Sequence, residues 1–310
     1  AQESRGLGDV YKRQGSPVTC KMGSTTKTAT EKNGVWTFGG LDLGTWTITS
    51  TKGGDSATQD VVITRLTVEY VTIVYRITPE FAYTGDYEIV DDSDNPISDF
   101  ASWKNNWKIR FLTSGTLTFT KLNGWNGQLD VFLVGGGGNG ETIRGARGGG
   151  GGYTKTVKGI SIAIATPYTV TIGASSGTSS AFGASANGAS GANGGSGGGG
   201  GGSSSGTPGN GGSNGGNGTA GNVSQGGAGQ GRTTREFGES TGKLYSGGGG
   251  GSAAGAGAAG DSTAGAGANF GGAAKNGVAN TGGGGGAAYS GTAGRGGSGI
   301  VIARNARRAA

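Results

Sequence analysis

Residues 130–134 read DVFLV, residues 135–152 read GGGGNGETIRGARGGGGG, and residues 298–304 read SGIVIAR. The first and last stretches are short apolar runs of the kind that form buried strands. Residues 135–299, from the end of the first run to Gly299 of the second, hold 62 of the 76 glycines of this 310-residue chain and form a glycine interval. If the two runs pair, both ends of the glycine interval are fixed to one sheet. The sequence therefore predicts a glycine-rich domain at 130–305, followed by a short tail at 306–310.

The glycine interval carries a period of three. Counting every third residue from Gly188 to Gly227 gives fourteen positions, of which twelve are glycine and two are serine. Three residues per turn is the repeat of a polyproline-II-type helix. Collagen is excluded because Pro208 is the only proline in this window. The pattern predicts polyglycine-II helices that fold back on one another, since only glycine lets two backbones approach closely enough to satisfy each other's N–H and C=O groups.

A flexible low-complexity linker is the alternative for this interval. Ordering a glycine costs about 0.5–1 kcal/mol more than ordering an alanine, and a backbone hydrogen bond contributes roughly 1 kcal/mol net. Strand-like segments inside the interval favour the ordered bundle, and they read GYTKTVKGISIAIA at 152–165 and YTVTIG at 168–173.

The chain before the glycine interval alternates with period two between turn residues, which predicts a small β-sandwich at 15–78. Asn33-Gly34 suits the turn of a tight hairpin. The residues expected to share one face of a sheet are Trp36, Phe38, Trp46 and Ile48. Residues 79–129 are interpreted as a short β linker region. The predicted fold class is therefore all-β, a sandwich module followed by a β-framed glycine-rich domain with polyglycine-II helices.

Two stretches resemble known families. The sequence NGVWTFGGLDLGTWTITSTKGGDSATQDVVIT, at 33–64, resembles the immunoglobulin-like or carboxypeptidase-regulatory-like β-modules of phage tail and bacterial surface proteins. Residues 130–305 resemble the glycine-rich domain of bacteriophage tail-fibre and tail-tip proteins. The motifs that carry this second resemblance are DVFLVGGGG, GGGGGYTKTVKG, YTVTIG, TTREFGESTGKLYSGGGG, NTGGGGG and GRGGSGIVIARN.

The second resemblance implies a non-enzymatic adhesin in which a rigid glycine scaffold carries receptor-binding turns. Phe182 and Phe270 stand alone among small residues and are candidate tip contacts. A charged and aromatic island offers further candidates, which are Arg232, Arg235, Phe237 and Tyr245, with Glu239 and Lys243 beside them. The alternative for this island is a structural crossover that closes the bundle.

The implied partners are a bacterial surface polysaccharide or an outer surface protein, together with other tail proteins bound through an upstream part of the chain. The implied location is the virion tail. A bacterial cell-surface adhesin or extracellular structural protein is the alternative, and ice binding by a flat face of small residues is a third hypothesis.

No nucleic acid is expected as a partner. Residues 135–310 carry a net charge of +8, but they lack a cluster of Lys and Arg interleaved with stacking aromatics. No membrane insertion is expected either, since no run of about 18 apolar residues occurs.

Composition also limits the catalytic and metal-binding chemistry that the chain can perform. Histidine is absent and Cys20 is the only cysteine, which excludes histidine-based catalysis, histidine-ligated metals and cysteine zinc sites. We expect no enzyme activity, no cofactor and no metal.

Two stretches resemble nucleotide-binding motifs and are rejected. The G-x-G-x-x-G at 135–140 opens no helix, and the P-loop-like stretch at 238–243 is followed by Leu244 where Ser or Thr is needed. The acidic run Asp91–Asn95 is interpreted as a solvated turn, with a calcium site as the alternative.

Residues 4–14 read SRGLGDVYKRQ, which resembles the in-frame translation of a transposon-end sequencing adapter. We therefore expect residues 1–14 to be an artefact that takes no part in the fold, and a genuine upstream segment to be missing.

Overall fold

The computed structural model describes residues 18–32, 35–39, 41–52, 55–64, 79–98, 106–123, 125–201, 207–211, 217–222 and 234–307. The chain is all-β in these residues, as predicted, with a single 3₁₀ turn, η1 (Glu236–Gly238). It forms two compact units, the first of residues 1–78 with Asn123–Trp125 and the second of Pro79–Leu122 with Asn126–Ala310. No helix in these described ranges has the length and apolar character that a membrane crossing needs. The adapter-like residues 1–14, the predicted turn Asn33-Gly34 and residues 65–78 of the predicted sandwich lie outside the described residues.

The first unit contains a four-stranded antiparallel sheet of order β2-β1-β5-β6 and a separate β3–β4 hairpin. Its strands are β1 (Val18–Met22), β2 (Thr25–Thr28), β3 (Thr30–Lys32), β4 (Val35–Thr37), β5 (Gly44–Lys52) and β6 (Asp55–Ile63). Cys20, Trp46 and Ile63 form its buried core, against which Phe38 and Ile48 pack. Three of the four residues predicted to share a face therefore meet, whereas Trp36 is half-buried on the separate hairpin.

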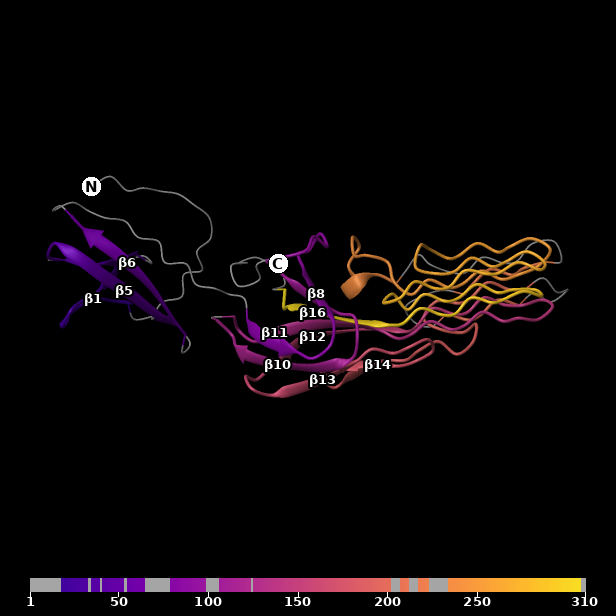
Figure 1. Ribbon diagram of the computed structural model, residues 1–310, viewed down its shortest axis with the longest axis horizontal. Coiled ribbons are helices and arrows are strands. Elements are labelled where there is room, and N and C mark those ends of the chain that lie inside the picture. The colour runs from indigo at the N-terminus through magenta and orange to yellow at the C-terminus, as the bar shows by residue number, and fades with distance from the viewer. Residues whose placement is uncertain are drawn as a thin grey trace. The chain divides into compact units, whose positions relative to one another are not determined.

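The second unit combines two five-stranded sheets with the glycine-rich region (Figure 1). One sheet has the order β15-β14-β13-β10-β7 and the other β12-β11-β16-β9-β8. The strands are β7 (Glu80–Tyr83), β8 (Tyr87–Val90), β9 (Lys108–Phe111), β10 (Gly115–Lys121), β11 (Gln128–Val134), β12 (Thr154–Ser161), β13 (Pro167–Thr171), β14 (Ser179–Ala181), β15 (Ala184–Ala186) and β16 (Ile300–Asn305).

Residues 79–129, interpreted from the sequence as a linker, belong to these sheets. Strands β7 to β10 lie within that range, and β9 pairs with β16 while β10 pairs with β13. The physical reason is that β11 and β16 are buried along nearly their whole length and need neighbours on every side. The linker interpretation is therefore corrected.

The predicted pairing of the two apolar runs is confirmed. Strands β11 and β16 are antiparallel neighbours in continuous register, from Leu129 opposite Asn305 to Val134 opposite Ile300. The glycine-rich region begins after Val134 and ends at Ile300, with β12 to β15 inside it, so the β11–β16 ladder of backbone hydrogen bonds fixes its first and last residues to one sheet.

Extended glycine runs pack side by side beyond the sheets (Figure 1). The six amides of residues 148–153 divide among three neighbouring runs, 187–191, 194–201 and 282–288, and amides three residues apart donate to the same run. In chain order the bonds are Gly148 to Gly199, Gly149 to Gly285, Gly150 to Gly191, Gly151 to Ser196, Gly152 to Gly282 and Tyr153 to Asn187, at N···O distances of 2.8–3.0 Å. The backbone N–H groups of a β-strand point alternately to two sides, with a period of two. The period of three in the donors of 148–153 therefore distinguishes these runs from β-strands.

This packing leaves no room for side chains between the runs. A Cβ atom on Gly149 would collide with the carbonyl oxygen of Gly138, and one on Gly284 would collide with the carbonyl oxygen of Gly149. Because these obstacles are backbone atoms of a neighbouring run, no rotamer change relieves them. Glycine is therefore a steric requirement inside this glycine bundle.

The runs travel back and forth between the sheets and one far end, the tip of the bundle. Residues 135–141 run outward from β11 and residues 147–153 return to β12, as the hydrogen bonds from Gly138 to Gly150 and from Glu141 to Arg147 show. The turns at 269–272 and 289–292 lie at the same end, because Ala268 donates to Ala287 and Ala288 donates to Glu141. The tip is thus a cluster of turns.

We expect G149A to lower the free energy of unfolding of the second unit by about 3 kcal/mol or more, because inserted carbon in a close-packed site forces backbone shifts. The matched control is G272A, where the nearest atom to a new Cβ would be the carbonyl oxygen of Asn269 at 3.3 Å. Urea denaturation of both variants measures the difference. Equal destabilisation by the two substitutions would contradict the close-packing explanation.

Candidate functional site

The described part of the charged and aromatic island, residues 234–246, folds over one face of the β11–β16 sheet. Phe237 and Tyr245 are buried in a cluster with Phe132, Val134 and Ile300, together with Ile302. The ring centroid of Phe132 lies 5.8 Å from that of Phe237 and 5.5 Å from that of Tyr245. The segment 234–246 therefore covers strands β11 and β16 with its aromatic side chains.

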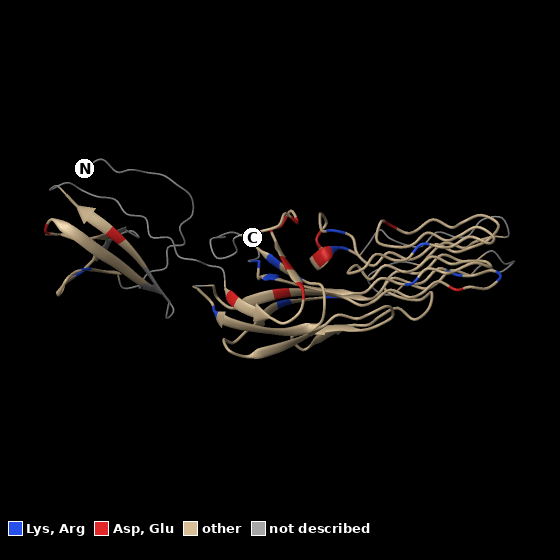
Figure 2. Cartoon of the chain, in the orientation of Figure 1, with Lys and Arg blue, Asp and Glu red and all other residues tan. Residues whose placement is uncertain are grey.

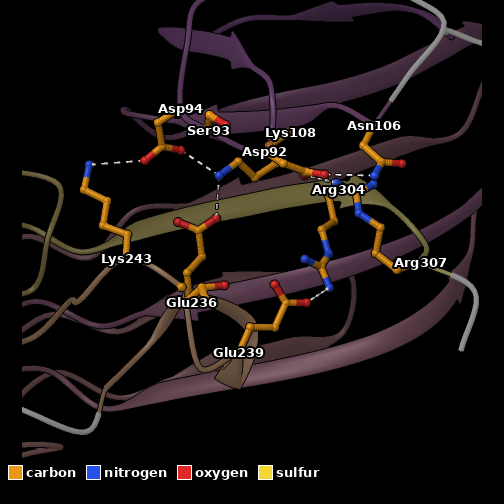
Figure 3. Close-up of a pocket in the computed structure, with 12 residues that line it drawn as sticks. Asp92, Ser93, Asp94, Asn106, Lys108, Glu236, Glu239, Lys243, Arg304 and Arg307 are labelled. Atoms are coloured by element: carbon orange, nitrogen blue, oxygen red, sulfur yellow. Dashed lines mark hydrogen bonds and ion pairs between the residues drawn. The ribbon is translucent and has the colours of Figure 1, made fainter. Parts of the chain in front are cut away.

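A buried lysine ties this segment to the sheet. Lys108 of β9, 5% exposed, places its Nζ atom 2.6 Å from Asp94 Oδ1 and 2.9 Å from Glu236 Oε1 (Figure 3). The Tyr245 hydroxyl donates to Glu236 Oε2 at 3.1 Å. Burial lowers the pKa of Lys108, but the hydrogen bonds and charges of Asp94 and Glu236 outweigh it and the pKa rises above its usual value. Burial, followed by the charge of Glu236, raises the pKa of Tyr245.

A second buried cation, Arg304, also ties segment 234–246 to the sheet. The Arg304 guanidinium of β16 lies 3.3 Å from Asp130 Oδ2 and 2.6 Å from Glu239 Oε1. It also lies over the Phe237 ring, 3.8 Å from the centroid, where a cation is attracted by the face of the π-system. The hydrogen bond from Arg304 holds the pKa of Glu239 below its usual value.

The charged side chains line an open pocket of about 520 Å³ between the 91–95 turn, β9, β16 and the segment 234–246. Figure 2 shows charged residues gathered near η1 and the C-terminus and only a few along the glycine runs. At the rim, Arg307 pairs with Asp92, and Lys243 Nζ lies 3.7 Å from Asp94 Oδ2. Because cations and carboxylates of this pocket pair with one another, we interpret it as an electrostatic closure, hereafter the closure, that fixes segment 234–246.

The acidic run is a turn, as predicted, but it is only partly solvated. Asp91 accepts hydrogen bonds from the backbone N–H groups of Ser93 and Asn95 and from the Asn95 side chain. The asparagine bonds lower the pKa of Asp91. Asp94 instead faces buried Lys108. No group of three or more potential metal-ligating side chains gathers within the described ranges.

The island candidates fall at this closure. Phe237 and Tyr245 are 4% and 0% exposed, so their rings are not on a surface that a receptor would touch. Arg235 is half-buried and donates to the Gly242 carbonyl at 3.0 Å. Arg232 lies outside the described residues. The prediction that Phe237 and Tyr245 contact a receptor is therefore corrected. In a region made mostly of small residues, these two rings are large enough to cover the apolar face of β11 and β16.

The two isolated phenylalanines lie in different places. Phe270 is at the tip, 70% exposed, with its ring centroid 5.0 Å from that of Tyr289. Phe182 is in the β14–β15 hairpin of the sheet region, half-buried, and packs on Tyr168 with a centroid distance of 5.2 Å.

Three turns meet at the tip. A parallel bridge joins Thr142 to Ala288 and so aligns the turn that carries Ile143 and Arg144 with the turn that carries Tyr289. The Gly271 N–H donates to Ser290 Oγ at 3.1 Å, which aligns the Phe270 turn with the Tyr289 turn. Sequence reasoning missed Ile143, Arg144 and Tyr289, although each is a large side chain in a small-residue turn, the same signal that singled out Phe270.

A family model for the glycine-rich domain matches residues 112–306. The match covers more than half of the chain and includes both strands that fix the bundle, so this protein belongs to the glycine-rich domain family. Searches of the curated proteins and of the solved structures find no match.

We expect K108M to destabilise the second unit by about 3 to 5 kcal/mol, because it leaves the buried Glu236 carboxylate without its cation. Adding E236Q should recover part of this loss, since glutamine retains an oxygen for Tyr245 and removes the unpaired charge. Urea denaturation of the two single variants and the double variant measures the coupling. Additive losses would show that the pair does not act as a unit.

The closure should also weaken in acid. Because folding lowers the pKa of Glu239, its pairing with Arg304 stabilises the unit above the ordinary glutamate pKa of about 4.3 and is lost as the pH falls through the lowered value. E239Q should therefore unfold at a lower urea concentration than the wild type at neutral pH, and the gap should close below about pH 4. A gap that is independent of pH would exclude the carboxylate as its source.

Proposed function

We propose that this chain is a non-enzymatic adhesin of a phage tail fibre or tail tip, which recognises a receptor on the host surface. The observation that carries the proposal is the cluster of exposed turns at the tip, where Phe270 and Ile143 are 70% and 59% exposed. Large apolar side chains exposed together at one end of a domain are typical of a binding surface.

The path of the chain supports this role. Strand β7 opens the second unit with Glu80 opposite Lys121, and β16 ends with Asn305 opposite Leu129. These pairs lie at the ends of their strands that point away from the glycine bundle. The first strand of the second unit therefore begins, and its last strand ends, opposite to the tip, which suits a domain that presents its tip to a surface.

The scaffold fits the same proposal. Amides three residues apart donate to the same neighbour, and side chains are excluded between runs, as expected for polyglycine-II helices. We propose that the glycine runs adopt this conformation. A bundle with hydrogen bonds in three directions is stiff, and it holds the turns at the tip in fixed positions with little loss of entropy on binding.

The proposed partners are a bacterial surface polysaccharide or outer surface protein at the tip, and other tail proteins upstream, with the first unit as a β-spacer. An enzymatic role is disfavoured because the chain lacks histidine and because the carboxylates of the pocket pair with cations of the chain itself. A bacterial cell-surface adhesin is the alternative with the same geometry.

Binding of the purified, labelled chain to a panel of bacterial strains tests the proposal. We expect adsorption to particular strains and competition by phage that infect them. F270A should reduce the affinity about tenfold or more, as loss of an interface aromatic does. The control is F182A, which removes an aromatic ring from the sheet region and should leave binding unchanged.

No strain-dependent adsorption would overturn the adhesin proposal. Equal losses in F270A and F182A would place the contact away from the tip. Adsorption that no phage competes would favour the bacterial surface protein instead.

A further inference from the structure

The tip combines aromatic rings with cations. Phe270 and Tyr289 form a pair of rings inclined at 45°, with Phe270 largely exposed. The bond from the Gly271 N–H to Ser290 Oγ joins the Phe270 turn to the Tyr289 turn, so the backbone that carries the two rings is held in place before any ligand arrives. An exposed, fixed aromatic face with polar groups beside it suits the apolar face of a sugar ring.

Three exposed basic residues lie in the adjoining turn and on the runs that return from the tip. Arg144 follows Ile143 in the adjacent turn, while Lys275 and Arg295 lie three residues beyond Gly272 and Thr292 on the runs that return from the tip. The hydrogen bonds from Ala274 to Thr292 and from Gly277 to Arg295 hold those two runs side by side.

These cations have no acidic partner among the residues that the structure describes. No ion pair to Arg144, Lys275 or Arg295 is formed within the described residues, whereas the nearby Glu141 pairs with Arg147 at 2.6 Å. The described runs of the bundle, 135–152 and 247–299, hold four basic and two acidic residues. The tip end therefore has a positive charge without internal compensation, and this charge is complementary to an anionic ligand.

We propose that the tip binds an anionic glycan, a sugar polymer that carries phosphate or carboxylate groups. The Phe270–Tyr289 pair stacks on a sugar ring, and Arg144, Lys275 and Arg295 pair with the acidic groups along the polymer. This inference rests on the proposed adhesin function and deepens it by naming the ligand class.

The test uses the full chain with three immobilised probes, which are neutral dextran, carboxylated alginate and a phosphate-bearing ribitol teichoic acid. We expect binding to at least one anionic polymer and none to dextran, and a decline in affinity with added salt, as ion pairing requires. Alginate and teichoic acid distinguish carboxylate from phosphate as the recognised group.

Two sets of variants separate a tip site from general attraction by charge. Y289A and R144Q/R295Q should each reduce binding to the anionic polymer about tenfold or more. The matched control K155Q/K158Q removes two exposed lysines from β12 in the sheet region and should change binding less than twofold. Equal losses in the two double variants would overturn the site.

Treatment of susceptible cells distinguishes this inference from the adhesin proposal itself. We expect periodate, which cleaves sugar diols, to abolish adsorption and protease to leave it intact. Adsorption that survives periodate and is lost after protease would identify a protein receptor and overturn the glycan inference while preserving the adhesin proposal. Adsorption to no cells at all would overturn the adhesin proposal.

Discussion

The glycine bundle depends on contact between one backbone and another with no side chain in between. Gly149 shows the constraint, because its own Cβ would meet the Gly138 carbonyl and its carbonyl would meet a Cβ on Gly284. Once side chains are excluded, each run is close enough to several others to exchange hydrogen bonds in three directions. These bonds replace the apolar burial that stabilises ordinary domains. Large side chains find room at the turns, against the sheets and on the outward-facing side of the outer runs.

The same constraint explains the closure. A glycine bundle buries little apolar surface, so the apolar core of the second unit lies in and between its sheets. Segment 234–246 covers the face of β11 and β16 there, and the pairs of Lys108 and Arg304 with acidic side chains hold it down. Buried charges of this kind are costly unless they are paired. Any other position of segment 234–246 would leave them unpaired, so the pairs favour one position of the segment on the sheet.

Much of the fold follows from the sequence because its signals are local. Apolar runs at 130–134 and 298–304 predict the strands that fix the bundle, and their pairing is observed. The part played by residues 79–129 and the burial of Phe237 and Tyr245 depend on contacts across distant stretches, which no local pattern records. Of the candidate site residues, Phe270 lies exposed at the tip, whereas Tyr289 and Arg144 join it only because turns far apart in sequence meet there.

Amide hydrogen exchange, followed by mass spectrometry on peptides within 135–141, 148–153 and 282–288, tests the central constraint most directly. Each of these runs donates its N–H groups to neighbouring runs, so exchange is predicted to be slow and comparable to that of β11. Exchange at the rate of an unstructured glycine-rich peptide would contradict the interlocked bundle and, with it, the fixed tip.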